Sequence, residues 1–274
     1  MVHPSRAALA LALTVLASCV PRVRAVITGH ALDEDGRPVP NLRVRLEDTG
    51  QATSTDRTGR FEIRYLGPLP ATEHLSLVGE AHARWVRPLR IEGHTRLEVT
   101  LRQHGTLTAI TLPTGQAPPV EVTVRTALGS ATLRIPSESL VSPDGRLASG
   151  QAVVSLTAWH PPEATGTAPG PLLGAVDGDT SAPKRLDAHA MVDIEVKQNG
   201  HSLQVAPGKA LEWVSTVPAG LTADGAALWS LDETRAVWVR QESNAGGALH
   251  VDPSARTLTG KVPHLGAWNV ATLP

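Results

Sequence analysis

The chain has 274 residues, with 25 basic and 26 acidic side chains, a formal net charge of −1 and a single cysteine, Cys19. A near-neutral charge without clustered basic residues excludes a nucleic-acid footprint and an electrostatic membrane patch, and a single cysteine excludes a disulfide within the chain. The 24 glycines and 22 prolines separate short apolar stretches, which favours strands and turns over helices.

The N-terminus has the order of a secretory signal peptide: a positive charge at Arg6, an apolar run over residues 7–16, and then small residues. The run is about ten residues long, whereas a helix needs about twenty residues to span a bilayer. We therefore expect this segment to direct export and to form no part of the mature fold.

Residues 16–19, Leu-Ala-Ser-Cys, resemble the lipobox of bacterial lipoprotein precursors. The resemblance implies a signal peptide over residues 1–18, lipid attachment at Cys19, and a lipidated tether over residues 19–25. Acylation would also explain an unpaired thiol in an exported protein, and two or more acyl chains hold a protein lastingly on a membrane. The alternative is an ordinary signal peptide, cut near Ala25, which leaves Cys19 without a role.

The same resemblance sets the expected location. The protein is expected at the bacterial cell envelope, with the membrane as a partner through the lipid on Cys19. Val20 stands where some bacteria place the Asp that retains lipoproteins at the inner membrane, so the outer membrane is favoured.

Apolar and polar residues alternate in the first part of the chain, as in strands with one buried face. This pattern predicts strands around residues 42–47, 61–65 and 97–101. Turns in which glycine supplies a positive φ are predicted at residues 35–36, 49–50 and 58–59. Short strands at this spacing favour an antiparallel sandwich.

Three stretches, residues 27–29, 33–44 and 53–61, have a pattern typical of a known domain family. On these stretches, residues 26–104 resemble the carboxypeptidase regulatory-like domain, a seven-stranded transthyretin-like β-sandwich. The last stretch contains a turn in which Asp56 can accept backbone hydrogen bonds before Phe61 enters the core. The resemblance implies a fold and no activity, since such modules accompany peptidases, transporters and adhesins as non-catalytic attachments.

The alternation continues in the second part of the chain, and helical periodicity is nearly absent. Strands are predicted around residues 120–124, 133–135, 154–158 and 192–196. Residues 161–183, rich in Pro, Gly, Ala and Thr, are predicted to form a long ordered or semi-ordered loop. The pattern pauses at residues 103–105, where we expect the link between two domains.

Short pieces at residues 131–136, 169–170, 203–209, 228–233 and 262–269 carry a second resemblance. Residues 131–136 resemble the start of ZU5-type β-domains. Together, the pieces make residues 105–274 resemble the extracellular region shared by cartilage intermediate layer protein and astroprincin. These families occur in adhesion, matrix and signalling contexts, so the resemblance implies a surface module. The predicted fold is all-β, with the seven-stranded sandwich followed by a larger C-terminal β-rich domain.

The stretch His264-Leu265-Gly266 is the most informative place to look for chemistry. Related β-rich domains cut themselves at a His-hydrophobic-Ser/Thr motif, in which the hydroxyl attacks the preceding carbonyl. Gly266 replaces the hydroxyl residue here, so no self-cleavage is expected. His264 is instead predicted to pack or to hydrogen-bond beside Trp268.

Two stretches rich in Asp and Gly are candidates for calcium, because carboxylates on a glycine-kinked backbone suit a hard cation. One contains Asp33 and Asp35, and the other contains Asp177 and Asp179. Neither continues with the spaced ligands of an EF-hand. Turns use the same residue types, so turns are favoured and calcium binding is left open.

The closest approach to a zinc cluster is Glu80 with His82 and Glu92 with His94. Their spacing matches no standard ligand set, and solvated strand ends explain them. Neither a nucleophile elbow nor a phosphate-cradling loop is present. We therefore predict no catalytic residue, no cofactor and no metal.

Six tryptophans accompany one Phe and one Tyr. Because few other aromatic side chains are available, the core is expected to use these tryptophans. Two or more exposed tryptophans in a row would instead form a sugar-stacking platform, so a carbohydrate-binding lipoprotein is kept as an alternative.

The sequence thus predicts a non-catalytic, membrane-anchored surface lipoprotein that serves as a binding, adhesion or envelope-assembly module. Its expected partner is a protein or a glycan of the envelope, and no nucleic acid. An alternative of another class is an envelope hydrolase or metal-dependent enzyme whose site is assembled from distant residues. A deep polar pocket with clustered His and carboxylate side chains would favour that alternative.

Overall fold

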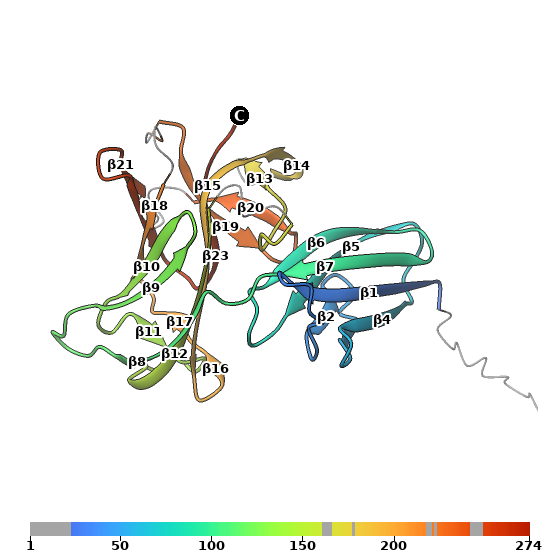
Figure 1. The fold of residues 1–274 in the computed structure, drawn as a ribbon, viewed down its shortest axis with the longest axis horizontal. Coiled ribbons are helices and arrows are strands. Elements are labelled where there is room, and N and C mark those ends of the chain that lie inside the picture. Colours follow the sequence, from blue (N-terminus) through green and yellow to red (C-terminus); the bar gives the residue numbers. More distant parts are fainter. Residues whose placement is uncertain (1–22, 161–165, 177–178, 218–220, 222–223, 242–248) are drawn as a thin grey trace, which may run out of the picture.

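The computed structural model describes residues 23–160, 166–176, 179–217, 221, 224–241 and 249–274 (Figure 1). Within these residues every regular element is a strand, so the all-β prediction is confirmed. No helix of the described residues is long and apolar enough to cross a membrane.

Seven strands build the N-terminal sandwich. They are β1 (Ala25–Asp33), β2 (Arg43–Leu46), β3 (Ala52–Ser54), β4 (Arg60–Tyr65), β5 (Ala71–Val78), β6 (Trp85–Ile91) and β7 (Thr95–Leu101). One sheet has the order β4-β1-β7 and the other has the order β3-β2-β5-β6. In the first sheet β1 is antiparallel to β4 and parallel to β7. This arrangement leaves one face of β4-β1-β7 on the outside of the sandwich.

The predicted alternation accounts for the core of this sandwich. Along β4 the side chains of Phe61, Ile63 and Tyr65 are buried, while the residues between them are exposed. The turn before β4 is fixed as predicted, because Asp56 Oδ1 accepts the backbone N–H groups of Thr58 at 2.8 Å and Arg60 at 3.0 Å. Phe61 therefore enters the core from a rigid turn.

The rest of the chain forms a second, larger body. Its strands are β8 (Thr106–Leu112), β9 (Val120–Thr126), β10 (Gly129–Ile135), β11 (Leu140–Val141), β12 (Gly150–Trp159), β13 (Leu173–Val176), β14 (Asp179–Arg185), β15 (Asp187–Gln198), β16 (His201–Ser202), β17 (Gln204–Val205), β18 (Leu211–Thr216), β19 (Ala227–Asp232), β20 (Val237–Arg240), β21 (Leu249–Asp252), β22 (Thr257–Val262) and β23 (Gly266–Thr272).

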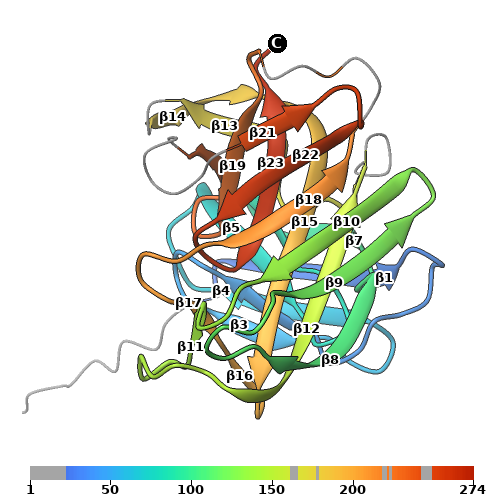
Figure 2. The same ribbon diagram turned by 90° about the vertical axis from the view of Figure 1, so that its left-hand side faces the viewer.

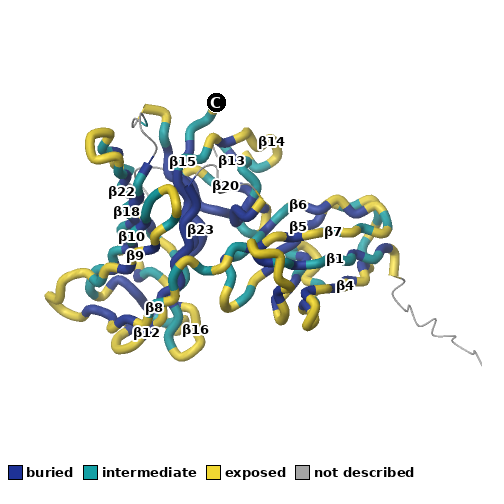
Figure 3. The backbone as a smooth tube through the Cα atoms, in the orientation of Figure 1, coloured by how far each residue is buried: buried dark blue, intermediate teal, exposed yellow. Residues whose placement is uncertain are grey.

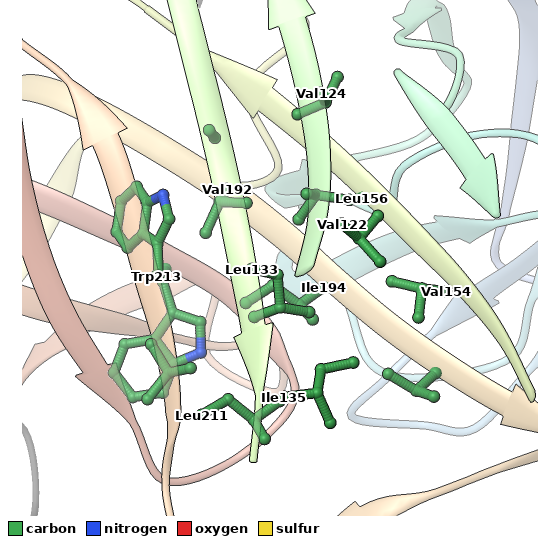
Figure 4. Packing of buried hydrophobic residues seen from close by; sticks show 14 of the residues in the cluster. Val122, Val124, Leu133, Ile135, Val154, Leu156, Val192, Ile194, Leu211 and Trp213 are labelled. Carbon is green, nitrogen blue, oxygen red and sulfur yellow. The ribbon is translucent and has the colours of Figure 1, made fainter. Parts of the chain in front are cut away.

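Two sheets of this body face each other. Figure 2 shows the sheet β21-β22-β18-β10-β9 toward the viewer, with the short pair β11-β17 at its lower end. Behind it lies the sheet β14-β13-β20-β19-β23-β15-β12-β8, to which β16 adds by pairing with β15. Apolar side chains from both sheets fill the space between them, as Val122, Leu133, Val192, Ile194 and Trp213 illustrate in Figure 4. The second body is therefore also a sandwich.

The prediction of a long loop over residues 161–183 is wrong for part of that range. β13 and the start of β14 lie within it, and β13 pairs with β14 on one side and with β20 on the other. The composition of this segment gives little strand propensity, so its extended form depends on pairing with its two neighbours, the adjacent strand β14 and the distant strand β20. Residues 161–165 and 177–178 lie outside the described part of the chain.

The N-terminal sandwich packs against the outer face of the larger sheet. Figures 1 and 3 show the buried strands β15 and β23 standing between the sandwich and the sheet that contains β18. Arg84, just before β6, pairs with the buried Asp193 of β15 at 3.0 Å and also with Glu233. Burial lowers the pKa of Arg84, but these two carboxylates raise it overall, which keeps the guanidinium charged.

Hydrogen bonds to main-chain carbonyl oxygens support the same contact. The backbone N–H of Val86 donates to the carbonyl oxygen of Pro169 at 2.8 Å, and the Arg87 guanidinium donates to the carbonyl oxygen of Ala168 at 2.9 Å. Residues 102–105 connect β7 to β8 beside this contact. The two bodies are thus joined by an ion pair and by hydrogen bonds as well as by the chain.

Candidate ligand-binding groove

The outward face of the sheet β4-β1-β7 carries a groove of about 750 Å³. The strand register arranges its polar side chains in rows that cross the three strands. The members of these rows are Glu62, Thr28 and Arg96 in one row, and Arg60, His30 and Glu98 in the next. All six alternate with residues that point into the sandwich.

The two rows have opposite polarity. One row runs from an acidic residue on β4 to a basic residue on β7, and the neighbouring row runs the other way. Strands lie about 4.8 Å apart, so the charged ends of a row are about 10 Å apart. Glu62 pairs with Arg64 at 3.0 Å, whereas Arg60, Arg96 and Glu98 form no ion pair with any described residue. Three exposed charges are therefore available to a ligand.

Two histidines lie in the groove. His30 Nε2 is 2.9 Å from the carbonyl oxygen of Thr58, and because a carbonyl only accepts, Nε2 must carry the proton. In the neutral ring this leaves Nδ1 of His30 as an acceptor. His94 Nε2 is 3.4 Å from the hydroxyl of Thr28. The centre of the groove thus offers hydrogen-bonding groups between the charged ends of the rows.

Thr53 and Ser54 of β3 close the groove beside β4, together with Asp56. The pKa of Asp56 is lowered by hydrogen bonds from the backbone of Arg60 and from the hydroxyl and backbone of Thr58. Its carboxylate is therefore committed to the turn. The hydroxyls of Thr53 and Ser54 add donors and acceptors that suit a polar ligand.

The side chains of the groove offer hydrogen bonds and charges. Its one hydroxyl–imidazole contact, Thr28 to His94, is longer than the 2.6–3.2 Å expected of an activated nucleophile. No carboxylate among the described residues hydrogen-bonds to His94 to orient the ring. The described part of the chain also contains no group of three or more His, Cys, Asp or Glu side chains arranged to hold a metal ion. The side chains present can hold a polar molecule through hydrogen bonds and charges.

The proposed lipid-attachment residue, Cys19, lies outside the described residues, as do the signal peptide and the first part of the tether. The first described residues, Val23 and Arg24, lead directly into β1, and the Arg24 N–H donates to the carbonyl oxygen of Tyr65 at 2.8 Å. Lipidation therefore stays a prediction.

Asp33, one of the calcium candidates, is buried at the end of β1. Its Oδ1 accepts the N–H groups of Asp35 at 3.0 Å and Arg37 at 2.8 Å, and its Oδ2 accepts Gln103 Nε2 at 3.1 Å. Burial raises the pKa of Asp33, but these hydrogen bonds lower it overall. Asp35 turns away to pair with Arg37. The carboxylate of Asp33 is thus occupied by the turn.

The other metal candidates are not brought together. Asp179 Oδ1 accepts hydrogen bonds from the hydroxyl and N–H of Ser181, and Asp177 lies outside the described residues. Glu92 pairs with Arg90, at the opposite end of β6 from His82.

His264 lies where the sequence predicts. Its ring is 4.4 Å from the ring of Trp268, and Trp268 Nε1 donates to the carbonyl oxygen of His264 at 3.1 Å. Gly266 has a φ of 121° and, having no side chain, contributes no nucleophile. The predicted packing role of His264 is confirmed.

The tryptophans belong to the core, as predicted. Five of them have less than 2% of their surface exposed: Trp159, Trp213, Trp229, Trp238 and Trp268. The sixth, Trp85, is only partly exposed, and the Arg87 guanidinium lies 4.8 Å from its ring centroid. The alternative of a row of exposed tryptophans that stack on sugars is therefore wrong.

Sequence reasoning missed the groove as a site. The alternation marks Glu62 and Glu98 as solvent-facing, but it does not show that β4 and β7 flank the same strand. The parallel pairing of β1 with β7 joins residues about seventy positions apart. The available signal was that the polar positions of these strands carry both charge signs.

Comparison with known proteins gives no family. No protein-family model and no curated protein matches the sequence. A DUF3823 family protein from Bacteroides ovatus aligns over 66% of this chain and 95% of its own, with 10% identity and a TM-score of 0.26. A candidate carbohydrate-binding protein from Bacteroides uniformis aligns over 91% and 99%, with 11% identity and a TM-score of 0.21.

A third solved structure, the major pilin subunit of Bacillus cereus, aligns over 92% of this chain and 85% of its own, with 11% identity and a TM-score of 0.24. Similarity this distant carries no conclusion about what the chain binds.

Proposed function

We propose that this chain is a non-catalytic binding module of the bacterial cell envelope, held on a membrane by lipid on Cys19, and that the outer face of β4-β1-β7 binds its partner. The observation that carries the proposal is the groove on that face, with three exposed charges that have no ion-pair partner among the described residues. A surface with charges of both signs and central hydrogen-bonding groups suits a polar protein segment or a glycan.

Catalysis is not part of the proposal. The Asp56 carboxylate in the groove supports a turn, and the described residues of the groove show no short nucleophile–base contact. Binding through charges and hydrogen bonds requires only that the side chains are held in place, and the sheet does this for all six residues of the two rows.

The groove is tested by comparing variants in a pull-down from envelope extract. The variant Glu62→Gln/Arg96→Gln removes both charges of one row, and the control Arg146→Gln removes an exposed charge on the other body. We expect the full-length protein and the control to recover the same discrete protein or glycan and the row variant to lose most of it. Equal recovery by all three would show that the face is not the binding surface.

The anchor is tested separately by mass spectrometry of the protein purified from membranes. The N-terminal peptide is expected to begin at Cys19 and to carry the mass of the acyl chains, and Cys19→Ala is expected to shift the protein out of the membrane fraction. An unmodified thiol at Cys19 would contradict the anchor and would leave the groove untouched.

A further inference from the structure

A second groove lies on the other body, which does not contain β4-β1-β7. It has a volume of about 690 Å³ and is lined by the segment between β17 and β18. Figure 2 shows the course of this segment. The lining combines this segment with the end of β22 and with prolines from three different connections, Pro136, Pro207 and Pro263. Residues of three separate stretches thus meet at one end of the five-stranded sheet.

Two lysine side chains line this groove. The chain contains only four lysines, and two of them, Lys209 and Lys261, line it. Both are exposed, and neither forms an ion pair with any described residue. By contrast, Lys197 pairs with Glu195 at 2.9 Å. The two ammonium groups are therefore available to an external anion.

The one acidic residue in the lining, Glu212, does not neutralise them. It lies opposite Lys261 in the β18–β22 ladder, but its carboxylate accepts a hydrogen bond from Arg134 Nη1 at 2.6 Å. Arg134 also pairs with Glu121 at 2.8 Å. The charges of Glu121, Arg134 and Glu212 are thus joined in a row across three strands, which leaves Lys261 at its end without an ion-pair partner among the described residues.

The backbone around the lysines is held in place. Residues Ala206 to Lys209 form a turn closed by the Lys209 N–H and the carbonyl oxygen of Ala206 at 3.0 Å. Pro207 and Gly208, with a φ of 74°, occupy the two central positions as a type II turn requires. The Ala206 N–H donates in turn to the carbonyl oxygen of Ser139 at 2.8 Å. Ligand binding would therefore lose little conformational entropy in this loop.

We propose that this groove is an anion-binding site for a phosphate group, in which Lys209 and Lys261 provide the charges. The phosphate could be free or carried by a sugar, and the two sources share the same contacts with the lysines. The groove lies outside the β4-β1-β7 face, so the site does not depend on the function proposed for that face or on lipid at Cys19.

The test is a titration of the full-length protein with inorganic phosphate, glucose 6-phosphate and glucose, followed by calorimetry at low salt. We expect saturable binding of the phosphate probes and none of glucose, with affinity that falls as salt rises. Tighter binding of glucose 6-phosphate than of inorganic phosphate identifies a sugar phosphate as the source, and equal binding identifies free phosphate.

The variant Lys209→Gln/Lys261→Gln is expected to weaken the binding of both phosphate probes about tenfold or more. The matched control is Lys184→Gln, which removes an exposed lysine on β14. A circular dichroism spectrum confirms that each variant is folded. The absence of saturable phosphate binding, or an equal loss in the control, would overturn the proposal.

Discussion

Single residues decide whether the first sandwich can close. Gly29 lies in the middle of β1, opposite Phe61 on β4, and the Phe61 ring occupies the space where any other residue would have a side chain. A Cβ at position 29 would be 2.1 Å from Phe61 Cζ. The ring of Phe61 completes the core because position 29 has no side chain.

Gly29→Ala is therefore expected to destabilise the protein by about 1–3 kcal/mol, because the Phe61 ring must move in a packed core. The control is Gly93→Ala, where an added Cβ meets no atom within 4 Å. The free energy of unfolding, measured by urea denaturation, checks both variants. An unchanged stability of Gly29→Ala would contradict the packing described for β1.

The local sequence predicted the roles of several single residues. The turn around Asp56 and the burial of Phe61 follow from residue types that act over a few positions, and both are confirmed. The requirement for glycine at position 29 was not foreseen, because it arises from a contact between Gly29 on β1 and Phe61 on β4, which are 32 residues apart in the sequence.

At the scale of elements, two connecting segments form the joint between the bodies. His82 precedes β6 and bridges to Gln103, and His104 Nδ1 is 2.9 Å from the hydroxyl of Thr157 on β12. Nε2 of each histidine is buried without a hydrogen-bond partner among the described residues. Burial lowers the pKa of both histidines, so the folded protein favours their neutral form.

Stability is therefore expected to fall with acidification. Below the ordinary histidine pKa of about 6.5, the unfolded chain binds protons at His82 and His104 more readily than the folded protein does. The contribution of the two neutral histidines to the free energy of unfolding is therefore present above about pH 6.5 and is lost as the pH falls. Denaturation between pH 7.5 and 5 measures the slope of the free energy of unfolding against pH. The variant His82→Gln/His104→Gln is expected to have a flatter slope, and an identical slope would contradict this role.

Element prediction failed where pairing, and not the pattern of residues, makes a strand. The alternating strands were located correctly, for example along β4 and β15, because their own residues carry the pattern. β13 lacks that pattern, and pairing with β14 on one side and β20 on the other accounts for its extended form. The two grooves were missed because each is assembled from segments that meet only in the folded chain.

For the whole molecule, the Arg84–Asp193 ion pair links the two bodies. Asp193 is 3% exposed, so it depends on the guanidinium of Arg84 for compensation. Breaking a buried pair from one side is costly, because the remaining charge stays in a poorly solvated place. The ion pair is therefore one of the contacts, together with the hydrogen bonds to Pro169 and Ala168, that hold the N-terminal sandwich on the larger sheet.

Arg84→Met is expected to lower the free energy of unfolding by about 3–5 kcal/mol, because it leaves Asp193 buried without its partner. Arg37→Met breaks an exposed pair with Asp35 and is expected to cost less than about 1 kcal/mol. Guanidinium denaturation gives the free energy of unfolding of both variants. Equal and small decreases in the two variants would show that Asp193 is stabilised in another way.

The central claim is that the outer face of β4-β1-β7 is the surface that meets the partner. The most direct measurement is photo-crosslinking in living cells, with a photoreactive amino acid in place of Glu98 in the groove and, as a control, in place of Arg146 on the other body. The account predicts one discrete adduct from position 98 and none from position 146. No adduct at position 98, or the same adduct at both positions, would contradict it.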